Sequence, residues 1–226
     1  MKEKSFDDLI LYTPSLHTLS GQTGSGKTGT ACAIGEKLHR VTGKDIYIVL
    51  KETDRPVEEY KLPDYIHSLR DAGNPPQDSV VIGDDWQRVA PARRAMSDIN
   101  VVLDELMGIL RHDDIDFILD VQTYASLDRN SVIRTDYRWY KTPYASEVEF
   151  ARPEIREEVA AADEALKGKD KTWAYLSSEN REKYTGLISG IKLPRWWSEE
   201  LSTMHRRLTP QEIEERKPLW QRWRIL

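Results

Sequence analysis

The chain has 226 residues, of which 39% are hydrophobic and 31% charged, and its formal net charge at pH 7 is -5. This length suits one α/β domain with a core of its own, or such a domain with a small extension, and it excludes two large domains. The mean hydropathy of -0.63 is typical of a folded, water-soluble protein. An acidic chain does not coat nucleic acid through overall basicity, although it can still carry a local basic surface that binds nucleic acid.

Three absences bear on where the protein works. The longest aliphatic runs are of strand length, far from the roughly 18 apolar residues that a membrane span needs. The N-terminus lacks the apolar segment and the cleavage site of a secretory signal. Cys32 is the only cysteine, which excludes an internal disulfide and a multi-cysteine zinc site. We therefore expect no membrane span and a cytoplasmic protein.

The first half of the chain alternates β-branched runs with amphipathic stretches, which is typical of βαβ units and a mostly parallel sheet. The spacing of apolar residues predicts helices over 27–41, 63–70 and 96–110. Strands are predicted over 16–20, 45–50, 79–82, 115–121 and 137–140. A charged helix is expected over 152–167, followed by irregular, aromatic and basic sequence. We expect a core over residues 1–150 and a helical or irregular C-terminal extension over 151–226.

Residues 21–28 read GQTGSGKT and satisfy the pattern G-x-x-x-x-G-K-[ST] of a phosphate-binding loop, the P-loop. Glycine permits the backbone torsions and the close approach by which successive N–H groups surround phosphate oxygens. Lys27 would reach the β- and γ-phosphates of ATP, and Thr28 would place its hydroxyl on Mg²⁺. The predicted nucleotide-binding residues are Gly21, Gln22, Thr23, Gly24, Ser25, Gly26, Lys27, Thr28 and Gly29.

Acidic residues follow the strand predicted at 79–82. A P-loop needs an acidic residue at the end of a neighbouring strand to hold Mg²⁺, and Asp84 is our candidate for that role. Asp85 stands where many ATPases carry a glutamate that polarises the attacking water, and aspartate is one methylene shorter. The alternative is that Asp84 and Asp85 form only an acidic turn.

Gln122 follows the apolar run 115–121, at the carboxyl end of a predicted strand, where nucleotide sites of α/β proteins lie. An amide donates to phosphate and accepts from water without adding charge. This favours a sensor of the γ-phosphate or of the attacking water, and an ordinary turn residue remains the alternative.

These segments together resemble the additional-strand ATPases of the FtsK/HerA superfamily, which includes viral genome-packaging ATPases and the Zot-like proteins of filamentous phages. The resemblance spans roughly residues 16–140 and rests on the P-loop, on residues 81–94, on residues 111–122 and on residues 127–136. It implies an α/β P-loop NTPase with a mostly parallel central sheet flanked by helices. It also implies an ATP-driven pump for double-stranded DNA, usually a ring of six subunits.

The chain departs from the family at Asp85, where the group mostly has glutamate, and at Gly83, which interrupts the strand before the acid. Zot-like proteins are commonly membrane-anchored, whereas this sequence shows no spanning segment. A packaging motor therefore fits better, acting on a viral genome and docked on a capsid or membrane-vertex protein. In such rings an arginine from the neighbouring subunit completes each site. We favour Arg129 and Arg134 for this role, with surface ion pairing as the alternative; the other arginines considered are Arg93, Arg94 and Arg111.

Two other functions remain open. A small-molecule P-loop kinase would suit the length and the acidic charge, but the arginines are not gathered into a lid. A nucleotide-gated assembly protein with weak hydrolysis would suit Gly83 and Asp85. Residues 134–141 and 216–224 are both basic and aromatic, a composition that suits DNA contact. The period-two alternation of 134–141 favours an ordinary strand over a DNA-binding loop, and residues 216–224 suit a protein interface as well as they suit DNA.

Overall fold

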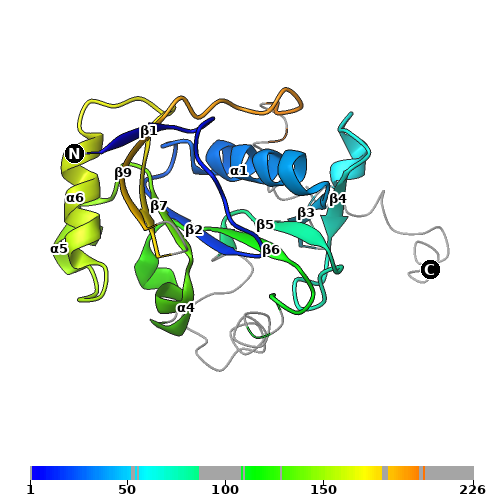
Figure 1. Ribbon diagram of the computed structural model, residues 1–226, viewed down its shortest axis with the longest axis horizontal. Coiled ribbons are helices and arrows are strands. Elements are labelled where there is room, and N and C mark those ends of the chain that lie inside the picture. The colour runs from blue at the N-terminus through cyan, green and yellow to red at the C-terminus, as the bar shows by residue number, and fades with distance from the viewer. Residues whose placement is uncertain are drawn as a thin grey trace, which may run out of the picture.

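The computed structural model of the protein describes residues 2–51, 54, 56–86, 108, 110–127, 129–179, 183–198 and 201. Within these residues the centre of the molecule is a nine-stranded sheet in the order β1-β9-β8-β7-β2-β6-β5-β3-β4 (Figure 1). The strands are β1 Glu3–Ser5, β2 Leu16–Ser20, β3 Asp45–Val49, β4 Ile66–Leu69, β5 Ser79–Gly83, β6 Asp116–Asp120, β7 Tyr137–Tyr140, β8 Ala174–Ser178 and β9 Tyr184–Ser189.

The strand pairings are parallel except at β8, which runs antiparallel to both β7 and β9. The predicted mostly parallel sheet is thereby confirmed. Strand β6 lies between the strand that precedes the P-loop and the strand that precedes Asp84, since it pairs with β2 on one side and β5 on the other. This inserted strand is the defining feature of the additional-strand arrangement that the resemblance implies.

Helices cover both faces of this sheet, with α1 on one face and α4 on the other (Figure 1). Helix α1 packs closely on the sheet, because a Cβ at Gly35 would lie 2.9 Å from Ile82 Cδ1. No helix in the described part of the chain is long and apolar enough to cross a membrane. The helices are α1 Lys27–Thr42, α4 Arg129–Arg134, α5 Ala145–Phe150 and α6 Arg156–Leu166, with 3₁₀ turns η1 Val57–Glu59 and η2 Tyr124–Ser126.

The core consists of two clusters of buried side chains on opposite faces of the sheet. Successive residues of a strand point to opposite faces, so Val81 joins one cluster while Val80 and Ile82 join the other. Phe117 and Ile118 of β6 divide in the same way. Because its strands are buried on both faces, the sheet reads in sequence as short apolar runs rather than as alternation.

Two predicted elements differ from the structure. The helix predicted over 63–70 is wrong: Ile66–Leu69 is an edge strand that pairs with β3, and its apolar residues at both ends mimic helical spacing. Irregular structure was expected after 167, but β8 and β9 extend the central sheet there. The boundary at residue 150 stays a prediction. The helix predicted over 96–110, Arg93, Arg94 and the basic segment 216–224 lie outside the described residues.

Candidate functional site

The P-loop joins the end of β2 to the start of α1. Gly24 and Gly26 have φ angles of 79° and 92°, in the left-handed region that glycine tolerates best. Gly26 is also the N-cap residue of α1, so the first free N–H groups of this helix open into the loop. The Ser25 hydroxyl oxygen is buried there without a hydrogen-bond partner. A backbone of this shape is suited to surround an anion.

The Lys27 side chain reaches back across the loop that precedes it. Its Nζ donates to the Gln22 carbonyl at 3.2 Å and lies 3.9 Å from Asp120 Oδ1. Lys27 is only 9% exposed, so its ammonium group lies inside the loop rather than in solvent. A cation held in this position is ready to contact the phosphates of a nucleotide.

Two buried carboxyl groups face the first turn of α1. The Thr28 hydroxyl donates to Asp84 Oδ1 at 2.8 Å and lies 3.4 Å from Asp120 Oδ2. Asp84 follows β5 directly, and Asp120 is the last residue of β6. Because β6 separates β2 from β5, Asp120 lies between the P-loop and Asp84. Asp84 is 4% exposed and Asp120 is 2% exposed.

The protonation of this pair is perturbed. Burial raises the pKa of the Asp120 carboxyl well above its ordinary value, and the charge of Asp84 and its hydrogen bond raise it further. Lys27 acts in the opposite direction but does not reverse the shift. Burial and the neighbouring carboxyl group therefore both oppose ionisation of Asp120.

This donor set fits Mg²⁺. The ion prefers oxygen ligands, keeps several waters and binds through one or two carboxylates together with substrate phosphates. Thr28 Oγ1 and the Asp84 carboxylate supply protein oxygens, and Asp120 Oδ1 is buried without a hydrogen-bond partner. No group of three or more His, Cys, Asp or Glu side chains in the described residues is arranged to hold a metal. At such a site the phosphates of a nucleotide would supply the further oxygen ligands of the ion.

Asp120 was missed by the sequence reasoning, which treated residues 115–121 only as an apolar strand leading to Gln122. A signal was present, since a carboxyl group at the carboxyl end of an otherwise apolar strand needs a partner. What the sequence does not give is the order of the strands in space. That order places Asp120 beside Lys27 and Asp84.

The two other predicted catalytic residues of this edge lie in the turns after β5 and β6. Asp85 is half-buried, with a φ of 47° that is uncommon for a residue other than glycine, and it is near enough to raise the pKa of Asp120. Gln122 is exposed, and its carbonyl accepts from Gly21 N–H at 3.3 Å. Both residues lie beside the P-loop, and their roles in water activation and sensing stay predictions.

The segment from the end of β7 into α5 supports both the P-loop and the turn after β6. Gln22 N–H donates to the Thr142 carbonyl at 2.8 Å, and Thr23 N–H donates to the Tyr144 hydroxyl at 3.0 Å. Glu147 Oε1 accepts from Tyr124 N–H at 2.8 Å, two residues after Gln122. One short stretch of chain thus fixes the P-loop relative to the predicted sensor.

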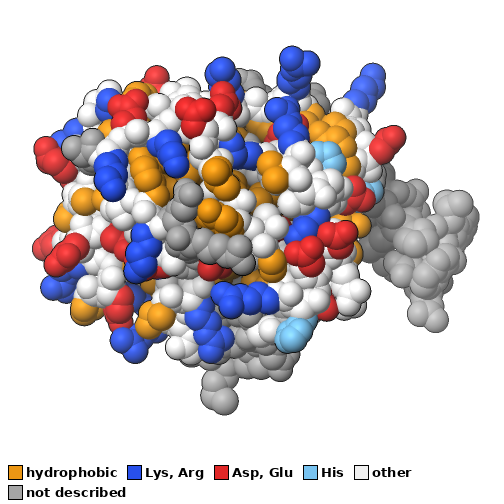
Figure 2. Space-filling model, viewed as in Figure 1, with side chains coloured by type: hydrophobic (Ala, Val, Ile, Leu, Met, Phe, Trp, Pro, Cys, Tyr) orange, Lys and Arg blue, Asp and Glu red, His pale blue; other side chains and the backbone are white. Residues whose placement is uncertain are grey.

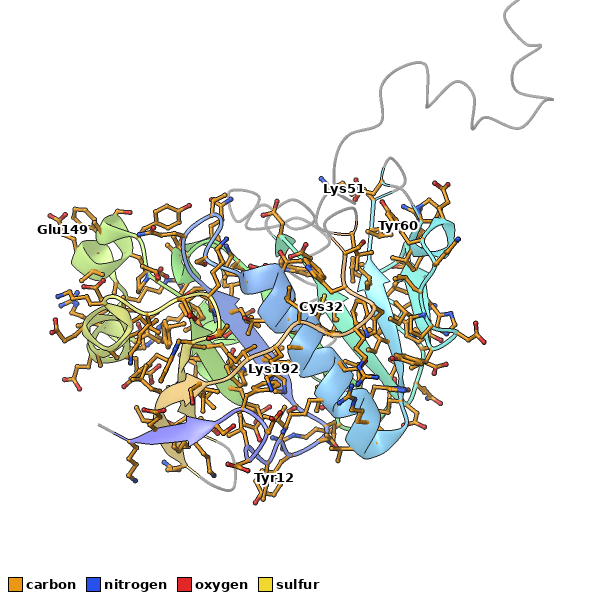
Figure 3. The ribbon with its side chains drawn as sticks, turned by 90° about the horizontal axis from the view of Figure 1, so that it is seen from above. Tyr12, Cys32, Lys51, Tyr60, Glu149 and Lys192 are labelled. Atoms are coloured by element: carbon orange, nitrogen blue, oxygen red, sulfur yellow. The ribbon has the colours of Figure 1, made fainter. Side chains whose placement is uncertain are left out.

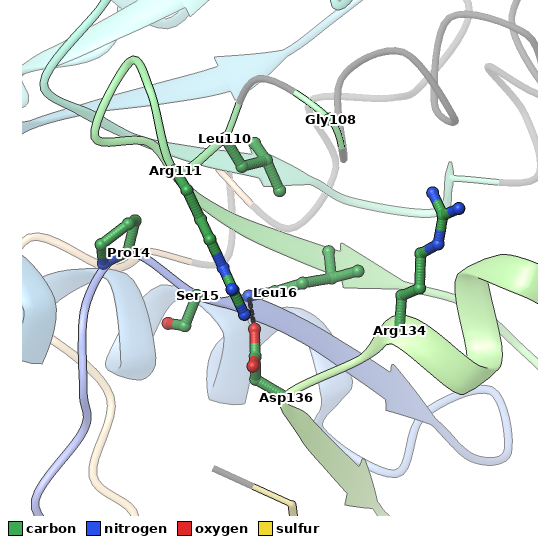
Figure 4. A pocket seen from close by; sticks show the side chains of 8 residues that line it. All are labelled: Pro14, Ser15, Leu16, Gly108, Leu110, Arg111, Arg134 and Asp136. Carbon is green, nitrogen blue, oxygen red and sulfur yellow. Dashed lines mark hydrogen bonds between the residues drawn. The ribbon is translucent and has the colours of Figure 1, made fainter. Parts of the chain in front are cut away.

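Of the two favoured arginines, Arg129 lies in an ion pair and Arg134 lies away from the P-loop of its own chain. Arg129 is exposed and pairs with Glu154. Arg134 lines a cavity of about 480 Å³ together with Arg111 and Asp136 (Figure 4). Leu16, the first residue of β2, also lines this cavity, so it opens at the edge of the sheet opposite to the P-loop. Arg134 therefore lies at the opposite edge of the sheet from the P-loop of its own chain, and its role between subunits stays a prediction.

Gly21→Ala is expected to lower both stability and nucleotide affinity. A Cβ at this position, where φ is 147°, would lie 2.7 Å from Lys141 Cβ and within 3.2 Å of the Lys141 backbone. The strain and overpacking cost about 1–3 kcal/mol and displace the first residue of the loop. Thermal unfolding and binding of a non-hydrolysable ATP analogue measure the two effects.

Gly43→Ala is the matched control for that substitution. Gly43 ends α1 with a φ of 81°, but no atom lies within 4 Å of its ideal Cβ. Alanine there should reduce stability by about 1 kcal/mol through backbone strain alone. An equal loss of nucleotide affinity in both variants would contradict the role assigned to the contact between Gly21 and Lys141.

Strand order and site together define the fold of a P-loop NTPase of the additional-strand type. No protein-family model matches the chain, and no curated protein matches it in sequence. Solved structures are similar in fold. The genome packaging NTPase B204 from Sulfolobus turreted icosahedral virus 2, in complex with sulfate, has a TM-score of 0.60 at 13% identity, covering 79% of this chain and 97% of that one.

Two further structures have the same fold. The DNA-packaging ATPase B204 from Sulfolobus turreted icosahedral virus has a TM-score of 0.57 at 16% identity, covering 79% of this chain and 98% of that one. The pCW3 conjugation coupling protein TcpA, a monomer with ATPγS, has a TM-score of 0.50 at 15% identity, covering 78% of this chain and 60% of that one. The predicted fold class is confirmed by this similarity.

Proposed function

We propose that this chain is an ATP-hydrolysing translocase of double-stranded DNA that packages a viral genome. The observation that carries the proposal is the placement of β6 between β2 and β5. It brings Lys27 and Thr28 together with Asp84 and Asp120, and it sets Asp85 and Gln122 in adjacent turns. An acid and an amide beside a P-loop suit the activation of water better than transfer of phosphate to a second substrate.

Each residue of this set has a distinct part in the proposed reaction. Lys27 and the N–H groups of residues 24–28 bind the β- and γ-phosphates, while Thr28 and Asp84 hold the Mg²⁺ that accompanies the nucleotide. When bound, this ion neutralises charge on the phosphates. Asp85 accepts the proton of the attacking water, and Gln122 orients that water against the γ-phosphate. Hydrolysis then needs no acceptor pocket for a second substrate.

The proposed DNA partner rests on the similarity to B204, which is described as a DNA-packaging ATPase. Lys and Arg side chains on the face drawn in Figure 2 are interspersed with acidic ones and do not form one continuous patch. We place DNA contact in the lumen of a hexameric ring, where a few cations from each subunit meet the duplex. Docking on a capsid or membrane-vertex protein belongs to the same proposal.

Phosphate release with and without double-stranded DNA tests the proposed function, alongside sizing of the protein with an ATP analogue. Release that is stimulated by DNA, from a ring, is the expected result. Transfer of phosphate to a nucleotide acceptor would instead identify a kinase. Assembly on nucleotide without turnover would identify a nucleotide-gated scaffold. Either of these outcomes would refute the translocase.

Mixing two inactive variants tests the proposed trans arginine. Arg134→Ala subunits keep Lys27, and Lys27→Ala subunits keep Arg134, so about a quarter of the interfaces in a mixed ring have both groups. We expect the mixture to recover activity that neither variant shows alone. The same mixture made with Arg129→Ala tells which of the two arginines acts between subunits, and no recovery with either variant would refute both.

A further inference from the structure

Two loops from the C-terminal part of the chain reach the edge of the sheet where the P-loop lies. Because β8 runs antiparallel to β7, the residues that precede β8 emerge beside the end of β7. Because β9 runs antiparallel to β8, the residues that follow β9 emerge at the same edge. The two loops are joined there, since Ile191 N–H donates to the Thr172 carbonyl at 2.9 Å.

A buried lysine fixes the first of these loops to the P-loop. Lys141, directly after β7, is 2% exposed, and its Nζ donates to the carbonyls of Lys171 and Trp173 at 2.7 and 2.5 Å. Burial lowers the pKa of Lys141 to about 8, with Asp170 acting in the opposite direction. The backbone of Lys141 packs on Gly21. Residues 166–173 are therefore held at a set distance from the phosphate cradle.

The second loop lies against the first turns of α1. An ideal Cβ at Gly29 would be 2.4 Å from Leu193 Cδ2, and one at Gly26 would be 3.2 Å from Lys171 Cβ. Figure 3, seen from above, shows the segment of Lys192 crossing over α1. Side chains from both loops thus flank the start of α1.

A cavity of about 410 Å³ lies between the P-loop and the first loop. Gln22–Ser25 and Thr142 form one wall, and the opposite wall contains Leu166 and the Trp173 indole. The ammonium group of Lys169 lies 3.9 Å from the centroid of this indole. The cavity therefore combines an apolar, aromatic surface with a polar rim, which is typical of small-molecule sites.

The direction of a bound nucleotide relates this cavity to the catalytic residues. Asp84, Asp85 and Gln122 lie on the β5 and β6 side of the P-loop, so the γ-phosphate points to that side. The other end of the nucleotide then points toward β7 and β8, where the cavity lies. We propose that this cavity holds the nucleoside half of the nucleotide, with the base packed on the Trp173 indole in place of the Lys169 ammonium group.

This inference rests on the proposed ATPase function, and its test separates the two. Binding of ATPγS and of inorganic tripolyphosphate, each with Mg²⁺, is measured by titration calorimetry on the full chain. Trp173→Ala is expected to weaken ATPγS binding about 5- to 100-fold, the range for loss of a base–aromatic stack, and to leave tripolyphosphate binding unchanged. Trp173→Phe should restore most of the affinity for ATPγS.

A second variant does not depend on removing a packed side chain. Thr142 is exposed at the mouth of the cavity, and Thr142→Trp should fill it and weaken ATPγS binding selectively. Trp197→Ala is the matched control, because Trp197 packs on the opposite face of the sheet from the cluster that Trp173 joins. Both affinities should stay unchanged in that variant.

The outcomes distinguish the two proposals. Unchanged ATPγS binding in both Trp173→Ala and Thr142→Trp would overturn the nucleoside assignment and leave the ATPase standing. Equal losses for both ligands would also overturn it, since the loop would then only support the P-loop. Wild-type protein that binds neither ligand would refute the proposed ATPase and this assignment with it.

Discussion

Lys27→Ala is expected to reduce ATP hydrolysis by about 10²–10³-fold or more, the scale on which loss of one preorganised charge-stabilising group acts. The Lys27 ammonium is already placed inside the loop, 3.2 Å from the Gln22 carbonyl, so it needs no rearrangement to meet phosphate. The substitution should also weaken binding of ATPγS and of tripolyphosphate alike. Steady-state phosphate release and calorimetry measure the two effects.

The same helix offers a control for Lys27→Ala. Lys37 also lies on α1, but its Nζ donates to the carbonyls of Phe6 and Asp7 at 2.8 and 3.0 Å, far along the helix from the P-loop. Lys37→Ala should leave both affinities and turnover unchanged. Full activity in Lys27→Ala, or an equal loss in Lys37→Ala, would contradict the phosphate site.

Asp120→Asn should give two effects of opposite sign: slower hydrolysis and a more stable protein in the absence of nucleotide. The pKa of Asp120 is raised in the folded state, so folding favours the protonated carboxyl. Below the unfolded pKa this group has no effect on stability. Between the unfolded and the folded pKa the carboxyl ionises only in the unfolded state, so the free energy of unfolding falls as the pH rises, and above the folded pKa the loss is complete. An amide cannot ionise, so it removes that penalty at neutral pH.

The measurement for Asp120→Asn is thermal unfolding as a function of pH. Each kcal/mol of relieved penalty should raise the midpoint by about 2–4 °C in a chain of this size. The advantage of the variant over the wild type should grow as the pH rises from the unfolded pKa. Mg²⁺ with ATPγS should stabilise the wild type more than the variant, because a cation beside Asp84 and Asp120 would offset the charge of the ionised Asp120 carboxyl, which the amide lacks.

Asp64→Asn is the control, since it removes the same charge from an exposed position. It should change neither the midpoint nor turnover. If Asp120→Asn destabilised the protein at neutral pH, the carboxyl group would be stabilised by partners other than those described, and its role beside Mg²⁺ would be refuted.

The parts of the fold that sequence predicts well are those with a local signal. The P-loop pattern fixes the end of β2 and the start of α1. The helix predicted over 27–41 is confirmed, and it ends one residue later, at Thr42. The apolar runs at 79–82 and 137–140 predict β5 and β7 for the same reason. These segments carry their own information, because turn residues or glycines bound them on both sides.

The parts that sequence predicts poorly depend on pairing with distant residues. Ile66–Leu69 becomes a strand only because β3 lies beside it, and β8 and β9 become strands by pairing with each other and with β7 and β1. Asp120 belongs to the same class. Its sequence neighbours are apolar, and its partners Lys27 and Asp84 are 93 and 36 positions away. Strand order, which no local pattern states, brings them together.

The support of the P-loop by the segment after β7 has a consequence for how the chain folds. Gln22 donates through its side chain to the Pro143 carbonyl, a contact 121 positions away in sequence, and Thr23 relies on Tyr144 at the same separation. Contacts of such long range form late, since the intervening loop must be closed first. During synthesis the glycine-rich segment therefore stays without its supports until a further 121 residues have followed. Nucleotide present at that stage finds no finished cradle, so binding reports completion of the domain.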